Sequence, residues 1–199
     1  MKTKIVAVIN QKGGTGKTTT TINLGSALSK QGHKVLLLDL DPQSNLSYSL
    51  AVSSPDQTLA EAFVGSKNLQ DILVEKDGLW VAPGSNELVD VEISLVTQPE
   101  RESFLKTMLS QVKGFDYVLI DCPPSLSVLT LNALTAAHEV LIPLQMEVLT
   151  LQGLDQIMNT IKKVKKAFNP KLKIKGIVVV MFDVRRKLSL EVLEYLREN

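Results

Sequence analysis

A glycine-rich segment near the start of the chain has the composition of a phosphate-binding loop. Residues 10–19 read Asn-Gln-Lys-Gly-Gly-Thr-Gly-Lys-Thr-Thr, after a short apolar run. Glycines let the backbone curl so that successive N–H groups point at phosphate oxygens. The positive end of a following helix favours the same anion. In such loops a lysine, here Lys17, reaches the β- and γ-phosphates, and the next hydroxyl, here Thr18, binds Mg²⁺.

The segment departs from the strict phosphate-loop motif at one position. That motif has a glycine five residues before Gly16, where this chain has Gln11. A glycine-rich turn without a ligand is the alternative, but a Gly-Lys-Thr triplet between a strand and a helix favours a nucleotide. We therefore predict that ATP contacts eight consecutive residues: Lys12, Gly13, Gly14, Thr15, Gly16, Lys17, Thr18 and Thr19.

Three aspartates follow apolar runs that are typical of buried strands. Asp39 and Asp41 are two residues apart at the end of one run, so they share a face of the strand. Asp121 follows the four apolar residues 117–120, a pattern whose carboxylate holds Mg²⁺, usually through water. Carboxylates at the carboxyl ends of parallel strands face the ligand crevice. An Asp-Pro turn at residues 41–42 is the alternative explanation for the first pair.

The rest of the sequence alternates between apolar runs and amphipathic runs. The apolar runs predict buried strands at Lys4–Asn10, Lys34–Leu40, Leu79–Ala82, Asp116–Asp121, Glu139–Pro143 and Ile174–Phe182. Helical periodicity predicts helices at Thr18–Lys30, Thr58–Phe63, Asn68–Leu73, Glu87–Leu95, Pro99–Val112, Leu126–Ala137, Leu151–Phe168 and Leu188–Arg197. This alternation predicts an α/β fold, a mostly parallel twisted sheet with helices on both faces, in one domain spanning residues 1–199.

The composition excludes several classes of protein. The chain has 199 residues, of which 44% are hydrophobic and 22% charged, as in ordinary globular domains. No run of about 18 apolar residues exists, so we expect no membrane-spanning helix. The single cysteine, Cys122, excludes an internal disulfide and a four-cysteine metal site. We expect a cytoplasmic protein.

The loop resembles the deviant Walker A loop of the ParA/MinD family of ATPases, most closely the small ParA/Soj-type partition ATPases. The resemblance rests on Lys-Gly-Gly-Thr-Gly-Lys-Thr-Thr at 12–19, Asp-Leu-Asp-Pro-Gln at 39–43 and Asp-Cys-Pro-Pro at 121–124. It extends from Lys4 to about Glu198. It implies ATP and Mg²⁺ as cofactors, weak intrinsic ATP hydrolysis and a homodimer that forms on ATP binding.

The resemblance also implies a role for each charged residue of these motifs. Lys12 would reach across the dimer interface to the partner's nucleotide, and Asp41 would position or activate the attacking water. With Lys17, these two residues form the predicted catalytic set. The metal would be held by Thr18, Asp39 and Asp121. The family normally continues past the last predicted helix with another strand and a closing helix, and we expect this chain to lack them.

Basic residues are concentrated near the end of the chain. Residues 162–187 contain ten basic residues and one acid, whereas the remainder contains 12 basic and 20 acidic residues. This asymmetry favours a polyanionic partner, although the lysines of the long helix also fit a solvated face. The resemblance at 181–189 implies non-specific binding of duplex DNA. We expect the contacts to come from Arg185, Arg186, Lys187, Lys162 and Lys166.

The resemblance leaves three functions open. The first is plasmid or chromosome partition on the nucleoid, with hydrolysis stimulated by a ParB-like centromere-binding protein. The second is a MinD-like ATPase that cycles on a membrane. That function needs a basic amphipathic helix, whereas the last predicted helix is acidic, so we expect no stable membrane association. The third is an adaptor that binds nucleotide without hydrolysing it, which a turnover assay would identify.

Overall fold

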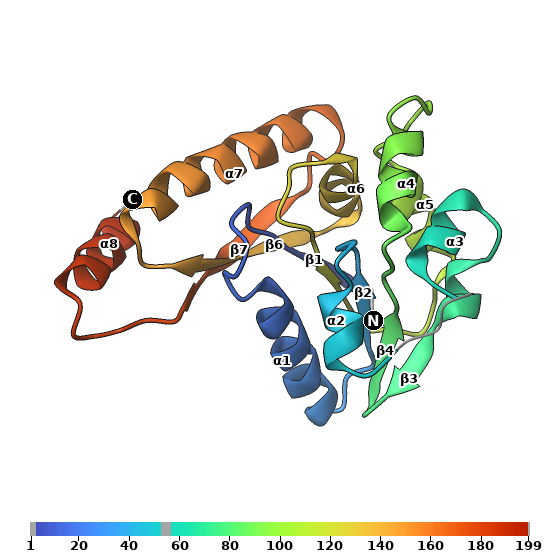
Figure 1. Ribbon diagram of the computed structural model, residues 1–199, viewed down its shortest axis with the longest axis horizontal. Helices are drawn as coiled ribbons and strands as arrows, with labels where there is room; N and C mark the ends of the chain where they lie inside the picture. Colours follow the sequence, from blue (N-terminus) through green and yellow to red (C-terminus); the bar gives the residue numbers. More distant parts are fainter. Residues whose placement is uncertain (1–2, 53–56, 199) are drawn as a thin grey trace.

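The computed structural model describes residues 3–52 and 57–198 and shows helices packed on both faces of one central sheet (Figure 1). The strands are β1 Lys4–Val8, β2 Val35–Asp39, β3 Val74–Lys76, β4 Leu79–Ala82, β5 Tyr117–Asp121, β6 Glu139–Gln145 and β7 Lys173–Val180. The helices are α1 Lys17–Lys30, α2 Asn45–Ser49, α3 Leu59–Val64, α4 Leu88–Leu95, α5 Phe104–Gln111, α6 Val128–Ala136, α7 Val148–Ala167 and α8 Lys187–Glu198. A single 3₁₀ turn occupies Leu69–Ile72.

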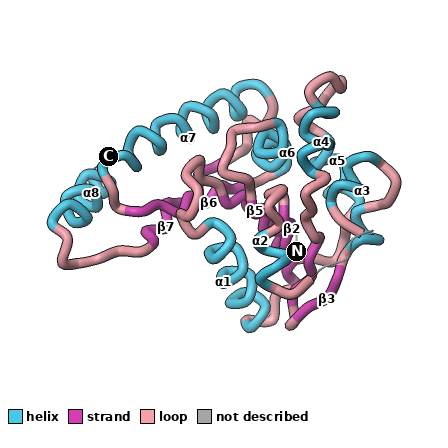
Figure 2. Tube along the Cα trace, viewed as in Figure 1, coloured by secondary structure: helices cyan, strands magenta, loops and turns pink. Residues whose placement is uncertain are grey.

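Within the described residues the sheet has seven strands in the order β3-β4-β2-β5-β1-β6-β7, and of these only β3 runs antiparallel to its neighbour. Figure 2 shows the strands in the middle of the molecule with helices around them. The predicted fold class is therefore confirmed. β1 lies between β5 and β6, with Val8 opposite Asp121 on one side and Leu141 on the other. The chain leaves β1 for β2 on one side and later adds β6 on the other. In open parallel sheets such a switch in strand order creates the ligand crevice at the carboxyl ends of the strands.

Two hydrophobic cores cover the two faces of the sheet. On one face, α1 and α2 pack against Val6, Leu37 and Leu119. On the other face, helices α3 to α8 contribute to a larger core built on Ala7 and Leu38. Because successive side chains of a strand point to opposite faces, strands buried on both sides must be apolar throughout. The uninterrupted apolar runs of the sequence satisfy this requirement.

Three local features differ from the sequence predictions. Helix α2 and strand β3 were not predicted, and both are short. Helix α5 begins at Phe104 rather than at Pro99, because residues 99–103 form turns. The side chain of Asn132, on α6, accepts a hydrogen bond from Leu105 N and donates one to Arg101 O. A distant side chain therefore sets the start of α5, which local sequence does not reveal.

Candidate nucleotide-binding site

The glycine-rich loop joins β1 to α1 in the geometry of a phosphate cradle. Gly14 and Gly16 have φ of 72° and 73°, in the left-handed region that favours glycine. The side chain of Asn10 donates to Pro143 O over 2.6 Å and accepts from Lys12 N over 2.9 Å. Asn10 thus ties the start of the loop to the end of β6. The first turn of α1 follows directly, with its free N–H groups facing the loop.

A cleft of about 550 Å³ opens over this loop. It is lined by seven of the eight predicted ATP-binding residues and by Asp41, and further by Gln43, Asn45, Ser49, Pro124 and Met181. Lys12 is the predicted residue that does not line it. Lys17 is buried at the base of α1, where its charge lowers the pKa of Asp121. The cleft therefore combines an anion cradle with a buried ammonium group.

Thr18 lines this cleft and contacts the buried Asp121, which does not line it, and together the two residues suit a divalent cation. The Thr18 hydroxyl donates to Asp121 Oδ2 over 2.6 Å. Asp121 is 1% exposed, and within the described residues its other carboxylate oxygen has no hydrogen-bond partner. Burial raises the pKa of Asp121 to about 7, and the neighbouring Asp39 and Asp41 add to this increase. A bound cation would satisfy the unpaired oxygen and favour the ionised form, so these residues fit Mg²⁺.

Asp39 is fully buried and, like Asp121, does not line the cleft. Its Oδ2 accepts hydrogen bonds from Ser47 N at 2.8 Å and Ser47 Oγ at 2.6 Å. The amide of Gly84 in turn donates to Ser47 Oγ. Burial is the main reason that the pKa of Asp39 is raised to about 6. The structure thus gives Asp39 a fixed protein partner on one oxygen and leaves the other without a partner among the described residues.

Asp41 lies at the cleft and lines it. It is 7% exposed, and its Oδ1 accepts from Gln43 N over 3.0 Å. The preceding amide, Leu40 N, donates to Asp121 O, so the segment after β2 is tied to the end of β5. This backbone contact fixes the two carboxylates relative to each other. Asp41 can therefore act at a defined position beside the loop.

Lys12 points to residues at the end of β6 in the same chain. Its Nζ lies 2.6 Å from Glu147 Oε2 and 3.5 Å from Gln145 Oε1. Lys12 and Glu147 are both partly exposed, with side chains 50% and 39% accessible. Lys12 is thus held beside the loop rather than inside its cleft.

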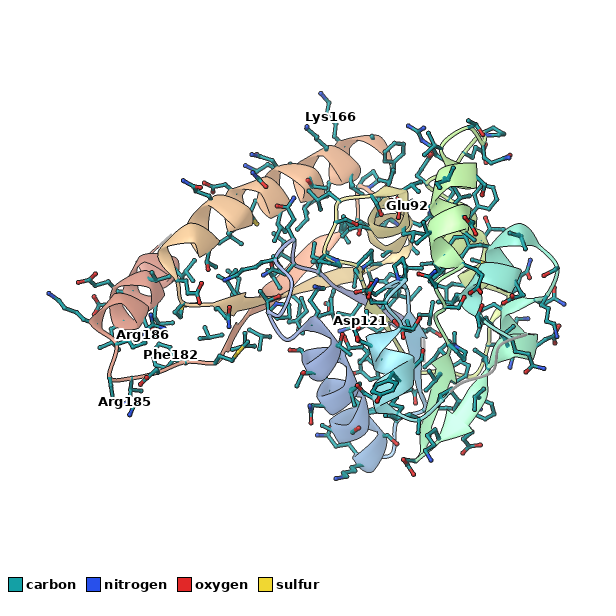
Figure 3. All side chains as sticks on the ribbon, in the orientation of Figure 1. Glu92, Asp121, Lys166, Phe182, Arg185 and Arg186 are labelled. Atoms are coloured by element: carbon teal, nitrogen blue, oxygen red, sulfur yellow. The ribbon has the colours of Figure 1, made fainter. Side chains whose placement is uncertain are left out.

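The basic residues near the end of the chain fall into two separate places. Lys166 lies far along α7 from Arg185 and Arg186 (Figure 3). Arg185 makes a two-pronged ion pair with Asp183, Nε–Oδ1 and Nη2–Oδ2 both at 2.9 Å. Lys187 pairs with Glu191 at 3.7 Å. The lysines of 162–175 are exposed, and none has an ion pair among the residues described. The lysine face of α7 (Lys162, Lys163, Lys165 and Lys166), opposite buried Ile157, Ile161 and Val164, therefore carries unneutralised charge. Arg186 likewise has no ion pair among the described residues.

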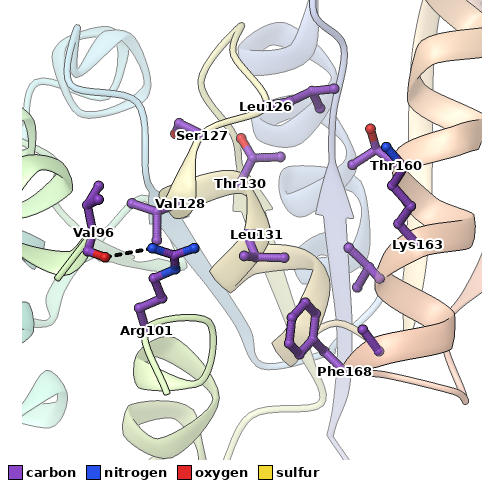
Figure 4. Close-up of a pocket in the computed structure, with 12 residues that line it drawn as sticks. Val96, Arg101, Leu126, Ser127, Val128, Thr130, Leu131, Thr160, Lys163 and Phe168 are labelled. Atoms are coloured by element: carbon purple, nitrogen blue, oxygen red, sulfur yellow. Dashed lines mark hydrogen bonds between the residues drawn. The ribbon is translucent and has the colours of Figure 1, made fainter. Parts of the chain in front are cut away.

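A second hollow of about 460 Å³ lies between α6, α7 and the turns before α5 (Figure 4). Its lining is mainly apolar, including Leu131, Val164 and Phe168, with Arg101 and Lys163 present as charged residues. Arg101 is already engaged, because its guanidinium donates to Val96 O. The hollow has no glycine-rich loop or carboxylate, so the phosphate chemistry belongs to the other cleft.

Sequence reasoning missed several residues that the fold brings to the site, and four of them make contacts or line the cleft in ways that shape it. Asn10 anchors the loop, and Ser47 holds Asp39. Glu147 pairs with Lys12, and Met181 lines the cleft. Asn10 and Glu147 stand at strand ends, as the predicted aspartates do, and that position is the one signal that could have identified them. Met181 also stands at a strand end, directly after β7, whereas Ser47 has no comparable signal in the sequence.

Comparisons with known proteins agree with this geometry. The family model described as an AAA domain matches residues 3–174. The chain is 43% identical to the sporulation initiation inhibitor protein Soj of Bacillus subtilis, covering 98% of this chain and 79% of that protein. It is 44% identical to the chromosome partitioning protein ParA of Caulobacter vibrioides, covering 98% and 76%.

One solved structure that is similar to this chain contains bound ligands. It is named cobyrinic acid a,c-diamide synthase from Mycobacterium smegmatis and contains an ATP analogue and magnesium. Its TM-score is 0.94 at 42% identity, covering 100% of this chain and 83% of that one. The family model matches more than half of the chain, and both relatives are more than 30% identical over nearly all of it. The chain therefore belongs to the ParA/Soj family of P-loop ATPases.

Proposed function

We propose that the chain is a Mg²⁺-dependent ATPase of plasmid or chromosome partition whose ATP-bound dimer binds duplex DNA without sequence preference. A ParB-like centromere-binding protein would stimulate hydrolysis, and the protein would act in the cytoplasm on the nucleoid. The observation that carries the proposal is the contact of Thr18 with Asp121, with one buried carboxylate oxygen unpaired, at the mouth of the phosphate loop. The partition names of the curated relatives support the biological setting.

Phosphate binding and metal binding are assigned to different residues of the cleft. Gly13 to Gly16 present backbone N–H groups to the phosphates, and Lys17 adds a positive charge beside the β- and γ-phosphates. Thr18 and Asp121 would hold Mg²⁺, with Asp39 behind them. The bound metal would neutralise charge on the phosphates during transfer.

Asp41 would hold the attacking water, because it is a fixed carboxylate at the cleft. Asp41→Ala should retain ATP binding and stop hydrolysis, which traps the dimer. Lys17→Ala should instead weaken ATP binding, because it removes a charge from the ground-state phosphates. Equilibrium binding of a fluorescent ATP analogue, with turnover measured in parallel, separates these outcomes. Equal loss of binding in both variants would contradict the different roles.

Lys12 would act on the partner's nucleotide, where its ammonium group would neutralise charge that develops on the transferred phosphoryl group. In support, Lys12 does not line its own subunit's cleft and is half exposed, so it is accessible to a second subunit. Lys12→Ala should abolish turnover. Normal dimerisation and normal hydrolysis in this variant would remove the proposed role in trans.

DNA binding would use the basic residues near the end of the chain, in two patches per subunit. One patch contains Arg185, Arg186 and Lys187, and the other is the lysine face of α7, including Lys162 and Lys166. Dimerisation would double both patches, and the two halves would bind as one unit with a steep gain in affinity. ATP would thereby control DNA binding without altering any basic residue.

The two patches can be tested separately. The logarithm of affinity should fall linearly with that of salt, with a slope of about −0.9 per neutralised phosphate. Arg185→Ala with Arg186→Ala, and Lys162→Ala with Lys166→Ala, should each reduce that slope on all sequences equally. Lys30→Ala with Lys106→Ala removes the same charge from exposed positions elsewhere and should leave the slope unchanged. If the two substitutions in one patch leave the slope unchanged, as the control does, that patch does not contact DNA.

The packing of α8 supports DNA over a membrane as the binding surface. Val192 of α8 is 5% exposed, and Leu193 and Leu196 pack against the main core. These apolar residues serve the fold and are not free to enter a lipid surface. Among the described residues, no helix is long and apolar enough to cross a membrane.

A further inference from the structure

The order of the strands places Lys12 beside Glu147, although 135 positions separate them in the sequence. β1 and β6 are parallel neighbours, with Val8 opposite Leu141. The chain leaves β1 into the glycine-rich loop and leaves β6 toward α7, at the same edge of the sheet. Asn10 bridges the two segments through Pro143 O. The two charged side chains therefore lie together because of the fold and not because of local sequence.

Glu147 is well placed to hold a cation. It is the last residue before α7, its amide donates to Gln145 O, and its carbonyl accepts from Thr150 N, so its backbone is fixed on both sides. Its carboxylate lies 2.6 Å from Lys12 Nζ, and Gln145 Oε1 approaches the same ammonium group. The Lys12 ammonium, with a smaller contribution from Arg186, lowers the pKa of Glu147. Glu147 is thus ionised at neutral pH and faces Lys12 directly.

We propose that Glu147 is a positioning residue that holds Lys12 within its own subunit, and that ATP-driven dimerisation must exchange this carboxylate for the partner's nucleotide. The inference rests on the role of Lys12 in trans proposed above. An ammonium group in contact with Glu147 cannot lie at the same time on a nucleotide in another subunit. The exchange replaces one anion by another, so the charge of Lys12 stays paired throughout.

The exposure of the pair sets the size of the effect. Exposed ion pairs are weak, and one such pair alters an equilibrium by roughly 1.5- to 5-fold. Each dimer breaks two such pairs, so the concentration needed for dimerisation would change by roughly 2- to 25-fold. The pair therefore biases the subunit toward the monomer without preventing the dimer. Salt should weaken this bias, because exposed charges are screened.

The test uses Glu147→Gln in the full chain, with Glu139→Gln as a matched control. Glu139 lies at the opposite end of β6 and pairs with Lys4 at 3.5 Å, another partly exposed lysine–glutamate contact. The first measurement is the rate at which acetic anhydride modifies Lys12 in the nucleotide-free protein, followed by mass spectrometry. The second is the protein concentration at which half of the chains dimerise with ATP and Mg²⁺, followed by analytical ultracentrifugation.

The proposal predicts that Glu147→Gln accelerates acetylation of Lys12 by roughly 1.5- to 5-fold and lowers the half-dimerisation concentration by roughly 2- to 25-fold. Glu139→Gln should change neither value. Unchanged acetylation of Lys12 would overturn the proposal, and so would faster acetylation with unchanged or weaker dimerisation. Failure of the proposed function has a different signature: the unaltered chain would form no ATP dimer, or Lys12→Ala would hydrolyse ATP normally.

Discussion

Asn10 connects the stability of the fold to nucleotide binding, and Asn10→Ala separates the two effects. The side chain is 6% exposed and makes two hydrogen bonds, to Pro143 O and from Lys12 N. Each lost hydrogen bond costs about 1 kcal/mol, and a buried carbonyl left without a partner costs about 1–3 kcal/mol. We expect Asn10→Ala to lower the free energy of unfolding by about 2–4 kcal/mol, which a domain of ordinary stability survives.

The same substitution should weaken nucleotide binding, because the loop loses its tether to β6. Ordering the backbone of one additional residue on binding costs about 1–2 kcal/mol, which corresponds to about a tenfold loss of affinity. Urea unfolding measures the loss of stability, and the dependence of the unfolding free energy on urea concentration should stay unchanged. Calorimetric titration of the folded protein with an ATP analogue and Mg²⁺ measures the loss of affinity.

Asn132 provides the matched control. It is also a buried asparagine, and it bonds Arg101 O, Val128 O and Leu105 N away from the cleft. Asn132→Ala should destabilise the fold at least as much as Asn10→Ala and leave nucleotide affinity unchanged. The reasoning is refuted if Asn10→Ala binds nucleotide normally, or if both variants lose affinity in proportion to their lost stability.

Three further predictions concern the glycines and the buried carboxylates. A Cβ on Gly84 would lie 2.5 Å from Asp39 O, so Gly84→Ala should cost about 3 kcal/mol in urea unfolding. Gly16→Ala should cost about 1–2 kcal/mol because φ is 73°, whereas Gly13→Ala, with open space around its Cβ, should leave unfolding unchanged. The pKa values of Asp39 and Asp121 are raised to about 6 and about 7, so without Mg²⁺ the native state holds more protons than the unfolded chain between about pH 4 and 7. The free energy of unfolding should therefore fall as pH rises through this window, by up to about 1.4 kcal/mol per pH unit for each carboxyl, and Asp39→Asn should remove part of the slope. Thermal unfolding at several pH values checks this sign, and a free energy that rises toward pH 7 would contradict it.

The sequence predicted those parts of the site that depend on local chemistry. The glycine-rich loop, Asp41 and Asp121 were identified because each follows a strand whose apolar residues are contiguous, and Thr18 because it follows the lysine of the loop. The fold class followed from the same alternation of strands and helices. These predictions needed no knowledge of which strands are neighbours.

Most of the site contacts that sequence reasoning missed depend on the order of the strands in the sheet. Asn10 bonds a residue 133 positions away, and Lys12 pairs with one 135 positions away, because β6 adds beside β1. Ser47 holds Asp39 from α2, a helix of five residues whose sequence shows no clear periodicity. The sequence also suggested one basic cluster. The structure separates Lys166 from Arg185, because Lys166 lies at the end of α7 and strand β7 then carries the chain away from it.

The most direct test of the account is electrophoretic retardation of unrelated duplex DNA fragments by the chain with ATP and Mg²⁺, with ADP and Mg²⁺, and without nucleotide. The account predicts retardation of every fragment with ATP, weak retardation in the other two conditions, and stronger retardation when Asp41→Ala traps the ATP state. Equal retardation in all three conditions, or retardation of a single sequence alone, would contradict the claim that ATP controls a DNA-binding dimer.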